Sequence, residues 1–174
     1  LAQVACRYFD HPSRALLVVG ATGTNGKTTV TWMLESIFRA AGMQPGVIGT
    51  TGYRVGEDAR PAAFTTPEAP QLQALLREMV DRSVRAAALE VSSHALAQHR
   101  TWGLECDVAV FTNLTQDHLD CHHTMEAYLD AKLMLFDGRN GGSKAGVAVV
   151  NADDPAAERV LAAARRGGMR VLTF

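Results

Sequence analysis

The chain has 174 residues, of which 47% are hydrophobic, and its formal net charge at pH 7 is -1. This length suits one domain with a buried core, and the near-neutral charge with scattered basic residues gives no electrostatic basis for a nucleic-acid or membrane partner. Three cysteines are too few for a disulfide framework, and no apolar run approaches the ~18 residues of a membrane span, so we expect a cytoplasmic protein.

The glycine-rich stretch Gly20–Thr29 (GATGTNGKTT) follows an apolar run at residues 15–19. A helical pattern comes after it, with a predicted apolar stripe of Val30, Met33, Leu34, Ile37, Phe38 and Ala41. Strand, glycine loop and helix in this order are typical of a phosphate-binding loop, whose unpaired N–H groups cradle polyphosphate oxygens. Ala21 replaces the usual first glycine, and it is small enough to leave the pattern intact.

Within this loop we expect Lys27 to reach the terminal phosphates and the Thr28 hydroxyl to hold Mg²⁺. The residues predicted to contact the nucleotide are Gly23, Thr24, Asn25, Gly26, Lys27, Thr28 and Thr29. The alternative is a glycine-rich turn with a chance Gly-Lys-Thr, and the strand and helix on either side argue against it.

The next segments predict a strand, an excursion and a helix. Gly42 is expected to end the first helix, and residues 46–50 form a strand. Residues 51–66 hold a Gly-Glu-Asp turn between extended pieces and are predicted to be irregular, a place where a second substrate often binds. Pro67 or Pro70 then opens a helix with apolar spacing at Leu72, Leu75, Leu76, Met79 and Val80.

Two buried strands are followed by polar residues. Residues 86–91 are apolar except for Glu90, and Ser92 begins a short helix that runs to Arg100. Residues 107–112 form another apolar strand, followed by a polar segment at 113–123. Because ligands sit at the carboxyl ends of strands in open α/β sheets, Glu90 and the polar segment are expected to lie beside the glycine loop.

A helix is predicted from Met125 to Phe136, with Lys132 on its inward face in one row with Tyr128 and Phe136. A lysine in that position needs a partner that settles its charge. The alternative is a lysine whose stem packs while its ammonium reaches water.

A glycine-rich loop (139–145) and a strand (146–150) come next, and Asp154 is predicted to cap a helix with Pro155 at its first position. A strand at 170–174 ends the chain. The alternation predicts an α/β fold of the P-loop NTPase type, a mostly parallel sheet with helices on both faces.

Nucleotide binding alone leaves a kinase, a switch, a motor or a ligase open. A guanine-reading Asn-Lys-x-Asp stretch and the Asp-x-x-Gly of a GTPase are both missing from the sequence. The chain resembles the central ATP-binding domain of the Mur ligases, on motifs in the family's order: Gly23–Thr29, Glu90–His94, Thr112–Leu114, Asp117–Asp120, Ala131–Lys132 and Asn151–Asp154.

The motifs at Phe64–Pro67 and Ser92–Arg100 are similar to the Mur ligases that add a diamino acid to UDP-N-acetylmuramoyl-L-alanyl-D-glutamate. The resemblance implies that ATP phosphorylates a carboxylate, and that an amine attacks the acyl phosphate. It also implies that residues 1–14 lead in from a preceding domain, that residues 15–174 are the central domain, and that a further domain follows. We therefore expect this fragment alone to be inactive, and the enzyme to be monomeric.

By the same resemblance, Thr28 and Glu90 hold one Mg²⁺ and His118 helps to hold a second. Lys132 matches a lysine that CO₂ carbamylates, and an inward lysine with a depressed pKa offers the neutral amine that CO₂ requires. Lys27, Glu90, His118 and Lys132 are thus the expected catalytic residues. The residues expected to contact the UDP-sugar dipeptide are Thr65, Thr66, Ser92, Gln98 and Arg100, of which Arg100 suits a carboxylate or phosphate.

Other interpretations stay open. A folylpolyglutamate synthase-like ligase would share the fold, and a nucleotide switch or a non-catalytic nucleotide-binding module would use the same loop. The histidines around Cys121 suggest a zinc cluster only weakly, because a single cysteine is present there. His94 and His99 are expected to be hydrogen-bonded helix residues rather than catalytic ones.

Overall fold

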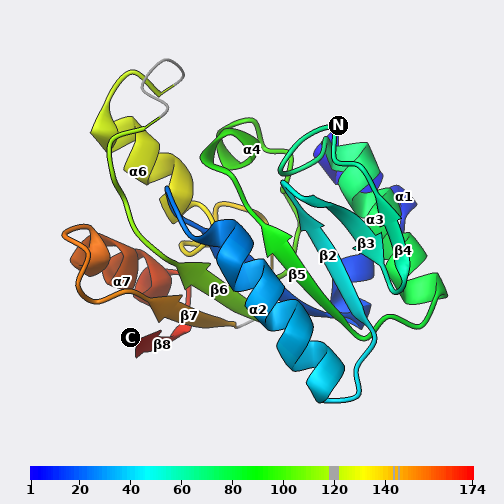
Figure 1. The fold of residues 1–174 in the computed structure, drawn as a ribbon. Helices are drawn as coiled ribbons and strands as arrows, with labels where there is room; N and C mark the ends of the chain where they lie inside the picture. The colour runs from blue at the N-terminus through cyan, green and yellow to red at the C-terminus, as the bar shows by residue number, and fades with distance from the viewer. Residues whose placement is uncertain (118–121, 143, 145) are drawn as a thin grey trace.

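The computed structural model describes residues 1–117, 122–142, 144 and 146–174. The strands in this part of the chain are β1 (Leu17–Thr22), β2 (Pro45–Gly49), β3 (Gly52–Val55), β4 (Asp58–Arg60), β5 (Ala86–Glu90), β6 (Val108–Phe111), β7 (Val147–Val150) and β8 (Arg170–Thr173). They form one sheet in the order β4-β3-β2-β5-β1-β6-β7-β8 (Figure 1).

The sheet is mostly parallel, as predicted. Strands β2, β5, β1, β6, β7 and β8 pair in parallel, whereas β3 and β4 pair antiparallel at the edge beside β2. The prediction of an irregular excursion at residues 51–66 was therefore wrong for its first half. The two extended pieces lie close enough in sequence to form a hairpin, which needs no long crossover.

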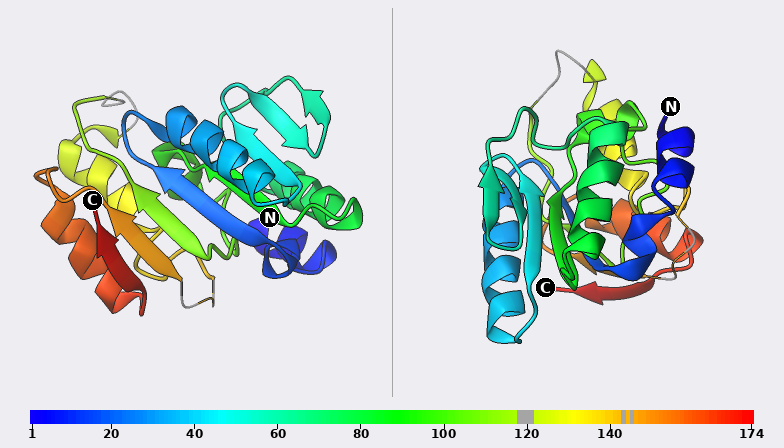
Figure 2. Two further views of the ribbon diagram at one scale, coloured as in Figure 1. Left: turned by 60° about the horizontal axis from the view of Figure 1, so that its bottom comes forward. Right: turned by 90° about the vertical axis from the view of Figure 1, so that its right-hand side faces the viewer.

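The helices are α1 (Ala2–Tyr8), α2 (Lys27–Ala40), α3 (Ala69–Asp81), α4 (Ser93–Ala97), α6 (Met125–Leu133) and α7 (Ala157–Arg166), with a 3₁₀ turn η1 at Pro12–Ala15. Helix α2 lies on one face of the sheet and α3 lies on the opposite face (Figure 2). Helix α1 packs against α3. The expected covering of both faces is confirmed. No described helix is long and apolar enough to cross a bilayer.

Alternating strand residues separate two apolar clusters. Val19 and Ala88 pack with Phe38 of α2, whereas Val18 and Leu89 pack with the residues of α3 and the other helices of that face. Strands buried on both faces have nearly continuous apolar sequences, which explains why β1, β5 and β6 could be predicted from apolar runs. Both clusters hold the carboxyl ends of these strands in fixed register.

The predicted apolar stripe of α2 is only partly buried. Phe38 lies in the core, but the side chains of Met33 and Ile37 are 60% and 58% exposed. Helix α2 packs mainly on β2, β5 and β1, so the sheet covers only part of the apolar surface of the helix.

The predicted cap at Asp154 was also wrong. Helix α7 begins at Ala157, and its N-cap residue is Ala156. The carboxylate of Asp154 instead accepts from the backbone N–H of Ala156 at 2.8 Å and from that of Leu114 at 2.7 Å. Asp154 therefore ties the turn before α7 to the segment that follows β6.

Candidate active site

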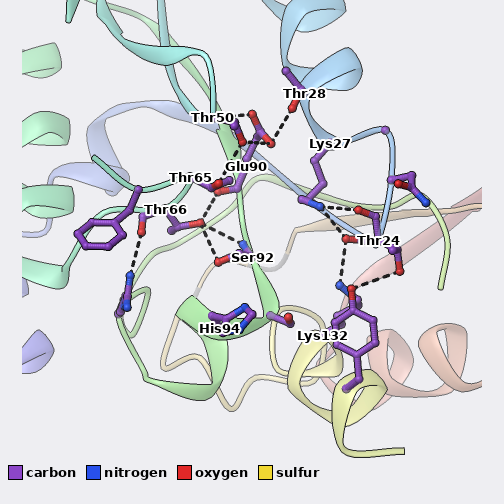
Figure 3. A pocket seen from close by; sticks show the side chains of 17 residues that line it. Thr24, Lys27, Thr28, Thr50, Thr65, Thr66, Glu90, Ser92, His94 and Lys132 are labelled. Atoms are coloured by element: carbon purple, nitrogen blue, oxygen red, sulfur yellow. Dashed lines mark hydrogen bonds between the residues drawn. The ribbon is translucent and has the colours of Figure 1, made fainter. Parts of the chain in front are cut away.

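A cavity of about 470 Å³ opens where the phosphate-binding loop meets the carboxyl end of β5 (Figure 3). Most of the residues predicted from the sequence line it: Gly23, Thr24, Asn25, Gly26, Lys27, Thr28, Thr65, Thr66, Glu90, Ser92, Arg100 and Lys132. Thr29 and Gln98 are exposed and do not line it. His118 lies outside the described residues.

The phosphate-binding loop spans residues 23–26, between β1 and α2. A side chain at Gly23 would force the loop or the segment after β6 to shift, because its Cβ would lie 2.0 Å from the Thr112 hydroxyl and the φ of Gly23 is +148°. Gly26 is the N-cap of α2 and no side chain among the described residues caps this helix, so its first N–H groups are available to an anion. The loop therefore has the construction that binds phosphate.

The segment after β6 holds the loop in shape. The side-chain Oδ1 of Asn113 accepts from the backbone N–H of Asn25 at 2.9 Å, and its Nδ2 donates to the carbonyl of Asn25 at 3.2 Å. The Thr112 hydroxyl donates to the same carbonyl at 2.6 Å, and the N–H of Thr24 donates to the carbonyl of Asn113. The polar strand end predicted to meet the glycine loop does so, and it fixes the loop backbone.

Lys27 lies in the first turn of α2 and folds back over the loop. Its ammonium donates to the carbonyls of Gly23 at 2.9 Å and Thr24 at 2.8 Å. Burial lowers the pKa of Lys27, and the negative charge of Glu90 opposes this shift. The ammonium is thus held at the loop, within reach of the place where terminal phosphates would bind.

Glu90 ends β5 and its side chain is 1% exposed. One carboxylate oxygen accepts from the Thr28 hydroxyl at 2.9 Å and the Thr50 hydroxyl at 3.2 Å, and the other accepts from the Thr50 N–H at 2.8 Å. A carboxylate beside a threonine hydroxyl is a hard-oxygen donor pair that fits Mg²⁺. Among the described residues, no group of three or more His, Cys, Asp or Glu is placed to hold a metal.

Lys132 points inward from α6, as predicted, and is 1% exposed. Its Nζ donates to the Gly23 carbonyl at 3.0 Å and lies 4.1 Å from the centre of the Tyr128 ring. Burial, and then the positive charge of Lys27, lower the pKa of Lys132 to about 7. A substantial fraction of this amine is therefore neutral at physiological pH.

Thr66 and Ser92 connect the other side of the cavity to the sheet. The Thr66 hydroxyl donates to the carbonyl of Glu90 at 2.8 Å and accepts from the N–H of Ser92 at 3.0 Å. The Ser92 hydroxyl accepts from the N–H of Ala95 at 3.2 Å, which caps α4. The Thr65 hydroxyl lies 3.0 Å from that of Thr50. These contacts make residues 65–66 a fixed wall.

Arg100 stands beside this wall. Its Nε donates to the side-chain oxygen of Gln98 at 2.8 Å, and its Nη1 donates to the carbonyl of Thr66 at 3.4 Å. Gln98, predicted to contact substrate, is placed as a neighbour of Arg100 rather than as a lining residue. In this conformation Gln98 helps to orient the guanidinium.

Five lining residues were not predicted as site residues: Thr50, Phe64, Ser93, His94 and Tyr128. Thr50 follows β2, so the rule that ligands lie at strand ends was the available signal. The Tyr128 hydroxyl donates to the Thr24 hydroxyl at 3.3 Å, which joins α6 to the loop. The rings of His94 and His122 lie 5.3 Å apart, and His122 Nε2 lies 3.0 Å from the Ser93 hydroxyl. These contacts join residues distant in sequence, so periodicity could not reveal them.

The arrangement combines a phosphate-binding loop, the hard-oxygen donor pair of Thr28 and Glu90, and the guanidinium of Arg100 in one cavity. The sequence profile of the Mur ligase middle domain matches residues 21–174. The UDP-N-acetylmuramoyl-L-alanyl-D-glutamate--2,6-diaminopimelate ligase of Geobacillus thermodenitrificans is 47% identical over 161 residues, which is 91% of this chain and 33% of the relative. The ligase of the same name from Listeria monocytogenes is 45% identical over 100% of this chain and 35% of its own length.

Solved structures agree in fold. A UDP-N-acetylmuramoyl-L-alanyl-D-glutamate--2,6-diaminopimelate ligase superposes with a TM-score of 0.83 at 34% identity, covering 98% of this chain and 36% of that structure. E. coli FolC in complex with DHPP and ADP superposes with a TM-score of 0.74 at 23% identity, covering 99% of this chain and 45% of that structure. This similarity shows a shared fold alone. The chain spans about a third of the length of the curated relatives that it matches.

Proposed function

This chain belongs to the Mur ligase family, and we propose that it is the ATP-binding middle domain of an amide ligase. The proposed reaction adds a diamino acid to UDP-N-acetylmuramoyl-L-alanyl-D-glutamate. The relatives named for that reaction are about three times as long as this chain. We therefore propose that domains before and after it bind the UDP moiety and the diamino acid, and that this chain alone does not ligate.

One observation carries the proposal: the phosphate-binding loop and the guanidinium of Arg100, with the wall of Thr65 and Thr66 beside it, line the same cavity. Lys27, Glu90 and Lys132 lie on the nucleotide side, whereas Thr66 and Arg100 lie on the other. A nucleotide switch needs only the first group. A ligase must bring a carboxylate up to the terminal phosphate of ATP, and it needs positive charge to do so.

In the proposed first step, a carboxylate oxygen of the acid substrate attacks the γ-phosphorus of ATP, and the bond from that phosphorus to the β–γ bridging oxygen breaks. ADP leaves and an acyl phosphate forms. Backbone N–H groups at the start of α2 bind the phosphate oxygens, and Lys27 moves its ammonium from the loop carbonyls onto them. These donors offset the repulsion between the carboxylate and the triphosphate.

In the second step, the neutral amine attacks the acyl carbon, the bond from that carbon to the phosphate oxygen breaks, and inorganic phosphate leaves as the amide forms, with the proton of the amine nitrogen passing to the departing phosphate or to water. The wall of Thr65, Thr66 and Ser92 is fixed by its contacts with β5 and Thr50, so it is suited to hold the acid substrate in one position. We propose that Arg100 binds an anionic group of this substrate.

The Mg²⁺ site of the proposal is formed by Thr28 and Glu90, whose oxygen atoms lie 2.9 Å apart. When bound, Mg²⁺ supplies charge neutralisation on the triphosphate. The hydrogen bonds from Thr50 hold the carboxylate of Glu90 in place beside the Thr28 hydroxyl.

We further propose a carbamate on Lys132 and a second Mg²⁺, with His118 as another ligand. The burial of Lys132 and its pKa of about 7 support the first part, because CO₂ reacts with the neutral amine. A carbamate would replace a cation by an anionic pair of oxygens at this position. Carbon-13 NMR of the full-length protein in ¹³CO₂ tests it: a carbamate signal that Lys132→Met removes is expected, and its absence in the presence of nucleotide and Mg²⁺ would refute it.

We propose that the enzyme works in the cytoplasm, where ATP and UDP-linked precursors are found, and we keep the proposal of a monomer without a nucleic-acid or membrane partner. The test uses the full-length protein with ATP, the UDP-dipeptide and a panel of diamino acids, and follows phosphate release and product mass. We expect release that depends on both substrates and is lost in Lys27→Ala. Release with folate substrates instead would favour the synthase alternative, and ATP binding without any release would favour a non-catalytic module.

A further inference from the structure

We propose that Phe64 is a positioning residue for the acid substrate: its ring holds the guanidinium of Arg100 at the cavity, ready for an anionic group. This proposal rests on the proposed function, since it concerns the side of the cavity assigned to that substrate. Phe64 lines the cavity together with Arg100.

Three oxygen acceptors surround Arg100. They belong to the Gln98 side chain, the Thr66 carbonyl and the carboxylate of Glu68, whose Oε1 lies 3.1 Å from Nε of Arg100. Hydrogen bonds and ion pairs of this kind engage the N–H donors, which lie in the guanidinium plane. The Arg100 side chain is 16% exposed, so part of the group still faces solvent.

The ring of Phe64 supplies a different kind of contact. The Cζ of Arg100 lies 5.2 Å from the centre of this ring, within the range of a cation–π interaction. Glu68 is half exposed, and an ion pair with an exposed partner contributes little on its own. The aromatic contact therefore limits where the charge can move when an incoming anion competes with Glu68.

The position of Phe64 is itself fixed. The hydroxyl of Tyr53 donates to the carbonyl of Phe64 at 2.6 Å and accepts from its N–H at 3.3 Å. Tyr53 is a buried residue of β3, paired with Ile48 of β2. The sheet thus sets the backbone of Phe64, although its side chain stays 50% exposed. A half-exposed aromatic ring whose backbone is held at a cavity by two hydrogen bonds is better explained by a role in the cavity than by core packing.

The test measures steady-state kinetics of the full-length ligase in Phe64→Leu, Phe64→Tyr and Arg100→Gln. Leucine keeps apolar bulk without a π face, so we expect the KM for the UDP-dipeptide to rise about three- to tenfold. We expect an unchanged KM for ATP and near-normal values in Phe64→Tyr, which restores the ring. Trp32→Leu is the matched control, because Arg54 lies over that ring at 5.9 Å and Trp32 does not line the cavity.

The double variant Phe64→Leu with Arg100→Gln separates positioning from direct contact. If Phe64 acts through Arg100, the leucine change adds nothing to Arg100→Gln. An equal rise in KM in that background, or no rise in Phe64→Leu alone, overturns the proposal. If the wild type ligates no substrate, the proposed function fails. In that case NMR of ¹⁵N-arginine-labelled protein still tests the contact between Phe64 and Arg100. We expect Phe64→Leu to change the chemical shift of the Arg100 Nε–H, and an unchanged shift would overturn the contact.

Discussion

Lys27 and Lys132 donate to the same atom, the backbone carbonyl oxygen of Gly23, at 2.9 and 3.0 Å. The two amines come from different helices, α2 and α6, and meet at the first residue of the phosphate-binding loop. Lys132 is buried and Lys27 is partly buried, and the charge of Lys27 lowers the pKa of Lys132 further. A triphosphate that attracts Lys27 would leave this carbonyl to Lys132, so we expect nucleotide binding to change the environment of Lys132.

The depressed pKa of Lys132 predicts a pH-dependent stability. Its folded value is about 7 against an ordinary 10.5, so between these values the unfolded chain binds more protons than the folded one. The free energy of unfolding of the wild type, relative to Lys132→Met, should then rise with pH above 7, by at most about 1.4 kcal/mol per pH unit, and stay flat below it. Urea unfolding from pH 6 to 9, without CO₂ or Mg²⁺, measures this. Parallel profiles for the two proteins would contradict it.

Gly23→Ala should prevent the phosphate-binding loop from forming. The new Cβ would lie 2.0 Å from the Thr112 hydroxyl, so the loop or the segment after β6 must shift. We expect a loss of about 2–4 kcal/mol of stability and no measurable ATP binding. Gly42→Ala is the control, because Gly42 has φ +71° but an added Cβ there would meet no atom within 4 Å. It should cost about 1–2 kcal/mol and leave ATP binding intact. Equal effects on binding would refute the steric argument.

Glu90→Gln should weaken the dependence of ATP binding on Mg²⁺. The amide keeps the size of the side chain but removes the charge, and only one of its two terminal atoms can accept from Thr28 and Thr50. We expect the factor by which Mg²⁺ increases the affinity for ATP to be about tenfold or more smaller in Glu90→Gln than in the wild type, as measured by calorimetry. Glu105→Gln removes another buried carboxylate, one paired with Arg14 at the opposite end of β6, and should leave the Mg²⁺ effect unchanged.

Ser83→Gly should stabilise the fold. Ser83 follows the C-cap of α3 with φ +61°, and the N–H of Val84 donates to the carbonyl of Met79. Gly42 occupies the same position after α2, where Met43 donates to Phe38. Serine is strained in this conformation and glycine is not, so we expect a gain of about 1 kcal/mol in urea unfolding. A loss of stability would show that the unfolded-state entropy of glycine outweighs the strain.

Several features of the site could be predicted from the sequence because they depend on local order. The phosphate-binding loop follows from a strand, glycines and a helix in succession, and Glu90 follows from a carboxylate at the end of an apolar strand. The inward direction of Lys132 follows from helical periodicity. Each of these rests on residues close together in the chain.

Other features were decided only by the tertiary structure. Helical periodicity placed Met33 and Ile37 on the apolar stripe of α2, but both side chains are exposed because the sheet covers a different part of the helix. Asp154 suited a helix cap, but it bonds to Leu114 across the fold. The sequence by itself determined most of the helices and parallel strands and which strand ends carry polar groups, since backbone geometry and the spacing of apolar residues are local, but it did not show that residues 52–60 pair as a hairpin. Only the packed fold decided which faces are covered, that Phe64 meets Arg100, and that two lysines share one carbonyl, because these contacts join residues that sequence spacing does not relate.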